Sequence, residues 1–107
     1  MIDDDDTVCR ATAAGLASEG YRVVTASSGE DGVRLSATHD VDVVVLDYSM
    51  PGLGPKATLE LLRTRRPALP VILYSGLAAH LDGASAHVAK PATSEHLRAE
   101  IRRVLGR

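Results

Sequence analysis

Hydrophobic and polar positions along this chain alternate between two periodicities. Four segments carry apolar side chains at helical spacing and are predicted helices: residues 7–19, 27–38, 56–66 and 93–105. Four short runs are rich in β-branched or other apolar residues and are predicted strands: 21–26, 42–47, 70–74 and 86–89. Residues 77–81 are predicted to add a turn or two of helix.

Residues at the helix ends support these boundaries. Gly20 is a stop for the first helix, and Pro67 stops the third. Ser27 followed by Glu30 is a capping-box pattern that opens the second helix. Thr93 is the predicted N-cap of the last helix.

The run of apolar residues 43–46 predicts a strand that is buried on both faces, which is typical of parallel sheets. Helices and strands alternate with brief connections, and this order favours a doubly wound α/β fold with helices on both faces of the sheet. We expect residues 1–107 to form one domain. In such folds, ligands bind beyond the carboxyl ends of the strands.

Composition excludes several classes of protein. A single cysteine, Cys9, excludes a disulfide framework. A net charge of −2 with no Trp or Phe gives neither an electrostatic footprint nor a stacking platform for nucleic acid. No apolar stretch is long enough to cross a bilayer, and the acidic N-terminus is unlike a secretory signal. We therefore expect a cytoplasmic protein with no nucleic acid or membrane partner.

Polar groups follow the predicted strands. They are the run Asp3–Asp6, Asp47, Ser75 and Lys90. Clustered carboxylates repel each other unless a cation neutralises them, and oxygen ligands suit Mg²⁺. A carboxylate beside Mg²⁺, with a hydroxyl and an ammonium nearby, is equipped to receive a phosphoryl group.

The spacing of these groups resembles the receiver domain of two-component response regulators, the CheY-like superfamily. Asp3-Asp4 lies seventeen residues before Gly20-Tyr21, and Asp47 precedes Met50-Pro51 by three and four residues. Further matching motifs follow in order: Ser75-Gly76, Gly83-Ala84 and Lys90-Pro91. The resemblance covers nearly the whole chain and implies a flavodoxin-like sheet of five strands in the order 2-1-3-4-5.

The resemblance also implies a role for each site residue. Asp47 would accept a phosphoryl group from the phosphohistidine of a histidine kinase or phosphotransfer protein. Asp4 and Asp47 would ligate Mg²⁺ through carboxylates, Ser49 through its backbone carbonyl, and Asp3 largely through water. Lys90 and Ser75 would contact the phosphoryl oxygens, and Ser75 and His87 would form the switch. Such a domain is a signalling module and at most catalyses its own phosphorylation and dephosphorylation.

The chain departs from the family pattern in two places. Only Met1 and Ile2 precede the acidic pair, so we expect a truncated first strand. Ser75 and Lys90 are fifteen residues apart, so the helix between them is expected to be shorter by roughly two turns. A smaller signalling face would leave the protein monomeric, with signalling through a downstream protein target or phosphoryl relay.

Some alternatives remain open at this level. Arg10 would fit the family better if Asp4-Asp5 were the acidic pair, so Asp5 is a reserve ligand. A degenerate receiver that binds partners without phosphorylation is a second possible function. The pattern Asp3-x-Asp5-x-Thr7 also matches the nucleophile motif of haloacid dehalogenase-type phosphohydrolases, although a full preceding strand and a further acidic pair are missing.

Overall fold

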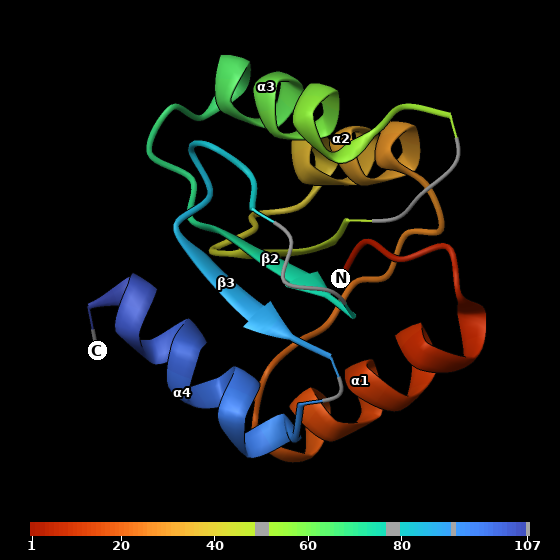
Figure 1. Cartoon of the computed structure of the whole chain (residues 1–107), viewed down its shortest axis with the longest axis vertical. Coiled ribbons are helices and arrows are strands. Elements are labelled where there is room, and N and C mark those ends of the chain that lie inside the picture. The colour runs from red at the N-terminus through yellow and green to blue at the C-terminus, as the bar shows by residue number, and fades with distance from the viewer. Residues whose placement is uncertain (49–51, 77–79, 91, 107) are drawn as a thin grey trace.

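A computed structural model of the chain describes residues 1–48, 52–76, 80–90 and 92–106. Its elements follow in the order α1 (Asp6–Ser18), α2 (Gly29–Thr38), β1 (Val44–Asp47), α3 (Pro55–Arg65), β2 (Val71–Ser75), β3 (Ala86–Ala89) and α4 (Ser94–Leu105). A central parallel sheet separates two helical layers, with α2 and α3 on one side and α1 and α4 on the other (Figure 1). The predicted doubly wound α/β architecture is thus confirmed.

The regular sheet has three strands in the order β1-β2-β3. Val44 lies beside Val71, and Ile72 lies beside Ala86, so all the strands run parallel. Every residue of β1 and β2 is buried, as the continuous apolar runs predict. In β3, by contrast, His87 and Ala89 are exposed.

Five strands are not confirmed. Ile2 makes isolated parallel bridges to Ala26 on one side and to Leu46 on the other. It therefore lies where the expected order 2-1-3-4-5 places the first strand. Residues 21–25 do not form the predicted strand, because Met1 and Ile2 are the only residues between this segment and β1.

Each face of the sheet supports its own hydrophobic cluster. The cluster under α2 and α3 centres on Leu46, Leu62, Val71 and Leu73. The cluster under α1 and α4 centres on Val45, Ile72, Leu97 and Ile101. Alternate residues of one strand serve opposite clusters, as expected for a strand covered on both faces.

The helix caps are confirmed in part. Thr93 accepts a hydrogen bond from the His96 backbone N–H at 3.0 Å and caps α4 as predicted. At α2, however, the cap is Ser28, which accepts from the Asp31 N–H, so the prediction of Ser27 is wrong by one residue. Glu30 does not complete a capping box; instead its Oε1 accepts from the Leu53 N–H at 2.9 Å.

The connection from β2 to β3 is short. Of the turn predicted at 77–81, residues 77–79 lie outside the described residues, and His80 and Leu81 are not helical. Leu81 is nevertheless buried in the cluster under α3. Arg63 of α3 holds the end of the connection, donating to the Gly83 carbonyl and to Ser85 Oγ.

In the part of the chain that the structure describes, no helix combines the length and apolar character that crossing a bilayer requires.

The packing of Ile2 against α2 gives a testable prediction. A Cβ atom on Gly32 would lie 2.2 Å from Ile2 Cδ1 and 2.7 Å from Ile2 Cγ1. Gly32→Ala therefore displaces Ile2 and should lower the free energy of unfolding by about 1–3 kcal/mol in urea denaturation, despite the higher helix propensity of Ala.

The matched control is Gly54→Ala, because a Cβ at Gly54 meets no atom within 4 Å. This control should change the unfolding free energy by at most a few tenths of a kcal/mol. Equal stability of the two variants would show that the position of Ile2 is not constrained by α2.

Candidate functional site

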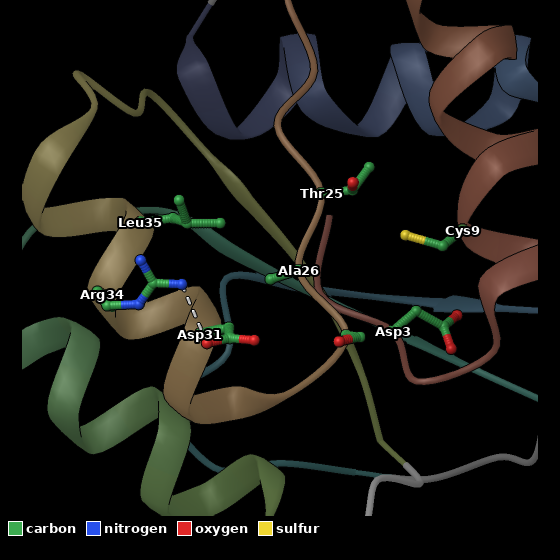
Figure 2. A pocket seen from close by; sticks show the side chains of 8 residues that line it. Asp3, Cys9, Thr25, Ala26, Asp31, Arg34 and Leu35 are labelled. Atoms are coloured by element: carbon green, nitrogen blue, oxygen red, sulfur yellow. Dashed lines mark hydrogen bonds and ion pairs between the residues drawn. The ribbon is translucent and has the colours of Figure 1, made fainter.

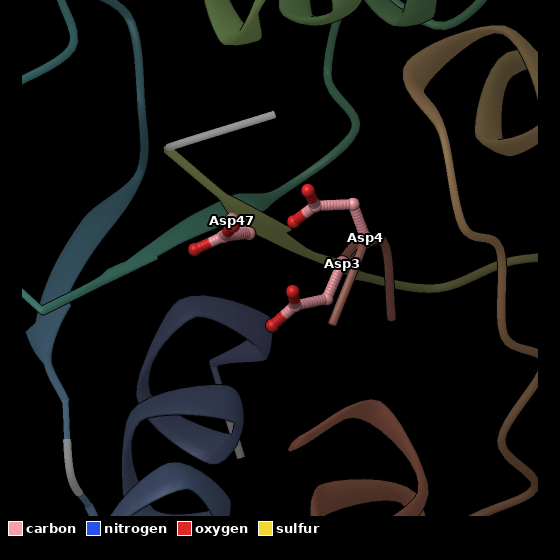
Figure 3. A group of neighbouring side chains, drawn as sticks. All are labelled: Asp3, Asp4 and Asp47. Atoms are coloured by element: carbon pink, nitrogen blue, oxygen red, sulfur yellow. The ribbon is translucent and has the colours of Figure 1, made fainter. Parts of the chain in front are cut away.

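Three carboxylates meet at the carboxyl ends of the strands. Asp3, Asp4 and Asp47 each place an oxygen atom within 4.8 Å of the others, and Figure 3 shows the three side chains gathered around one space. Asp3 and Asp47 are 1% and 5% exposed, whereas Asp4 is exposed. The group therefore has two buried members and one that faces solvent.

The short N-terminal segment positions Asp3 beside Asp47. The Ile2 N–H donates to the Val45 carbonyl and the Asp47 N–H donates to the Ile2 carbonyl, both at 2.8 Å. On the other side, the Asp3 N–H donates to the Ala26 carbonyl at 3.0 Å. Two residues thus align the acidic pair with the end of β1.

Lys90 follows β3 and links the two buried carboxylates. Its Nζ donates to Asp3 Oδ2 and to Asp47 Oδ1, each at 2.9 Å, and its side chain is 20% exposed. The ammonium also lies 5.1 Å from the centre of the Tyr74 ring. Tyr74 in turn accepts a hydrogen bond from the Ala92 N–H through its hydroxyl.

The pKa values of these groups reflect burial and crowding. Burial raises the pKa of Asp47 above its ordinary value, and the charges of Asp3 and Asp4 add to this effect, while Lys90 opposes it. Burial would lower the pKa of Lys90, but the hydrogen bonds and charges of Asp3 and Asp47 outweigh it, so this pKa is raised. Lys90 is therefore held in its charged form.

One ammonium does not neutralise three carboxylates. The excess negative charge and the all-oxygen donor set suit a hard divalent cation such as Mg²⁺. The side chains present therefore fit the predicted metal.

The other predicted residues are placed as follows. Ser75 ends β2 and is buried; Asp47 pairs in the sheet with Tyr74, the residue before it. Ser49 lies outside the described residues. His87 lies on the exposed side of β3 and contacts the short connection instead of the acidic cluster. Its Nε2 accepts from the Leu81 N–H at 3.1 Å, and its ring stacks on His80 at 4.7 Å.

Asp5 does not join the cluster. Its Oδ1 accepts hydrogen bonds from the N–H groups of Thr7 and Val8, so it is the N-cap of α1. Among the described residues, the carboxylates grouped with Asp47 are Asp3 and Asp4, and the reserve pair Asp4-Asp5 is therefore not supported.

Two features of the site were missed by sequence reasoning. Tyr74 supports Lys90, and the signal for it was its position directly before Ser75 at the end of a buried run. A pocket of about 250 Å³ also opens beside Asp3, between Cys9 of α1 and the Asp31–Arg34 ion pair of α2 (Figure 2). No spacing in the sequence indicates that pocket, because its walls come from segments that are distant in sequence.

A family model for the response regulator receiver domain matches residues 1–102. The chain belongs to this family. It is 37% identical over 114 aligned residues to the transcriptional regulatory protein AfsQ1 of Streptomyces coelicolor, covering all of this chain and 50% of that protein. It is 29% identical to the cell cycle response regulator CtrA of Brucella ovis, covering 49% of that protein. The chain thus spans about half the length of these curated relatives.

Solved receiver structures share the fold. A receiver domain protein from Clostridium thermocellum is 28% identical with a TM-score of 0.88, over 98% of this chain and 90% of that one. The response regulator TrrA from Thermotoga maritima, solved in complex with Mg²⁺-BeF, is 22% identical with a TM-score of 0.87, over 96% of this chain and 94% of that one. The flavodoxin-like receiver fold is therefore confirmed.

The raised pKa of Asp47 predicts the effect of neutralising this receiver residue. A carboxyl group whose pKa is raised by folding loses stability for the fold as the pH rises from its ordinary value through the raised value, so at pH 7 the ionised form is unfavourable. Asp47→Asn keeps an oxygen acceptor for Lys90 and removes the charge. We expect it to melt at a higher temperature than wild type in Mg²⁺-free buffer.

The control for this melt is Asp40→Asn at an exposed position, which should leave the melting temperature unchanged within error. A lower melting temperature for Asp47→Asn alone would show that the ion pair with Lys90 outweighs the cost of burying the carboxylate.

Proposed function

We propose that this receiver domain accepts a phosphoryl group on Asp47 from the phosphohistidine of a histidine kinase or phosphotransfer protein. The observation that carries the proposal is the ion triad in which Asp3 and Asp47 share the Lys90 ammonium, at the strand ends and beside Asp4. A buried carboxylate in an acidic cluster with one fixed ammonium is a costly arrangement for stability alone. It is useful for charge that arrives with a cation and a phosphoryl group.

The proposed transfer balances as follows. A carboxylate oxygen of Asp47 attacks phosphorus, an O–P bond forms, and the P–N bond to the partner's imidazole breaks. Lys90 now contacts Oδ1 of Asp47, which leaves Oδ2 for the attack. The Lys90 ammonium then pairs with the phosphoryl oxygens, and the Ser75 hydroxyl donates to one of them.

We assign the Mg²⁺ site to the carboxylates of Asp4 and Asp47 and the backbone carbonyl of Ser49, with Asp3 acting largely through water. The metal, when bound, would offset the charge on the transferring oxygens. The TrrA structure was solved with Mg²⁺-BeF, which supports the same assignment here. In this site Asp3 holds Lys90 by one oxygen and accepts the Asp5 N–H with the other.

Ser75 and His87 are proposed as the switch. Ser75 lies one residue beyond the partner of Asp47 on β2, and His87 lies on the neighbouring β3. Inward movement of the His87 ring would break its hydrogen bond from the Leu81 N–H and its stack on His80. The change would therefore reach the short β2–β3 connection.

This function is signalling in the cytoplasm, and the only chemistry it requires is the domain's own phosphorylation and dephosphorylation. A degenerate receiver, acting without phosphorylation, is the alternative that the next experiment tests. The phosphohydrolase alternative is not supported, because the chain belongs to the receiver family and Asp5 caps α1. The absence of a nucleic acid partner remains a prediction for this chain only, since AfsQ1 is twice its length.

Acetyl phosphate tests the acceptor. With Mg²⁺, wild type should gain one phosphoryl group by intact mass, and the label should be lost at alkaline pH. Asp47→Asn should gain none, because an amide is not a nucleophile. Asp31→Asn, which changes a carboxylate of α2, is the control and should label as wild type does. Equal labelling of Asp47→Asn and wild type would contradict the assignment.

Light scattering tests the expected monomer. The β2–β3 connection is short and His87 replaces a larger aromatic residue, so the face around α4 offers little of the 1,200–2,000 Å² that a stable interface typically buries. With beryllofluoride and Mg²⁺, the protein should stay monomeric at micromolar concentration. An activation-dependent dimer that is lost in Arg98→Ala or Arg102→Ala would show that this face still assembles.

A further inference from the structure

A groove of about 560 Å³ lies between residues 20–24 and residues 41–45, at the N-terminal end of the molecule's central segment. Its size is within the range of ligand sites in proteins. Apolar side chains line it on both faces of the sheet: Leu35 and Val41 on the side of α2, and Leu16, Val23, Val43 and Ile101 on the side of α1 and α4. We call it the strand-acceptor groove.

The backbone hydrogen bonds at the inner end of the groove form a parallel ladder with two sides. On one side, the Met1 amino group donates to the Val24 carbonyl at 3.0 Å and the Ala26 N–H donates to the Met1 carbonyl at 2.9 Å. On the other side, the Ile2 N–H donates to the Val45 carbonyl. The ladder ends at Met1, while both walls continue past it.

The walls therefore present backbone groups as well as apolar side chains. In an extended chain, the N–H and C=O of one residue point to the same side. The Val45 C=O points toward Ile2, so the Val45 N–H points toward the groove. Val24, whose C=O points to Met1, is 38% exposed. A hydrocarbon ligand would leave such N–H groups unpaired, whereas an extended peptide would pair them.

Charge at the inner end selects the kind of peptide. The Met1 ammonium lies there, and burial lowers its pKa. A carboxylate placed beside it would replace the solvation that the ammonium has lost. The groove thus offers an apolar, two-sided ladder that ends at a positive charge.

We propose that the strand-acceptor groove binds, in trans, the carboxyl-terminal end of an apolar peptide. About four extended residues run parallel to β1, and the terminal carboxylate pairs with the Met1 ammonium. This binding is separate from the phosphoacceptor chemistry, because no group of the ion triad lines the groove. It would complete the sheet around Ile2.

The probe is the peptide acetyl-Lys-Lys-Val-Ile-Val-Val with a free carboxylate, titrated into the full chain by calorimetry. The lysines supply solubility, and the four apolar residues suit walls that are apolar on both faces. We expect saturable binding, a rise in melting temperature, and at least about tenfold weaker binding of the same peptide as a carboxyl amide. Equal affinity of acid and amide would overturn the proposed pairing with Met1.

Two variants at one position test the location. Val24→Pro removes the backbone N–H of the groove wall and should abolish binding, whereas Val24→Thr keeps it and should bind within about twofold of wild type. Circular dichroism confirms that each variant is folded. If Val24→Pro is unfolded, a peptide with Pro at its second Val decides instead, and it should not bind. Binding that survives these changes would contradict the proposal.

An extended chain distinguishes the remaining occupant. Joining Val-Ile-Val-Val to Met1 by a peptide bond should fill the groove and abolish binding of the free peptide. If the extended chain is stabilised but the free peptide never binds the unextended protein, the groove accepts only a joined segment, and binding in trans is wrong.

Discussion

The ammonium of Lys90 stands 2.9 Å from each of two buried carboxylates, and the rest of the site depends on this contact. It lets Asp3 and Asp47 lie side by side away from water, where two unpaired charges would be prohibitively costly. The three residues come from the two ends and the middle of the chain, so the contact also closes the sheet across its full sequence. Asp4 then leaves the cluster with an excess of negative charge that suits a divalent cation.

Two N-terminal residues hold this arrangement in register. Ile2 is bonded to both neighbouring backbones, and Gly32 leaves the space that its side chain fills. The apolar cluster under α2 and the acidic site at the strand ends are therefore mechanically linked through one residue. The same economy leaves the strand-acceptor groove open beyond Met1, because the walls extend further than the segment between them.

Much of the fold and site followed from local pattern. The buried runs in β1 and β2, the Thr93 cap and the apolar face of α4 are properties of short segments, and the structure confirms them. Asp3, Asp4, Asp47 and Lys90 came together because parallel strands align their carboxyl ends. The strand predicted at residues 21–26 was wrong, because strand formation depends on a partner that the local sequence does not contain. The ring of His87 was equally unpredictable, since its contacts depend on the path of the β2–β3 connection.

The most direct test of the central assignment is to locate the phosphoryl group. Protein treated with acetyl phosphate and Mg²⁺ is reduced with borohydride, which converts an aspartyl phosphate to homoserine, and the peptides are sequenced by tandem mass spectrometry. The account predicts homoserine at position 47 and intact aspartate at positions 3 and 4. Homoserine at either of those positions, or at none, would contradict the role of Asp47 as the phosphoacceptor.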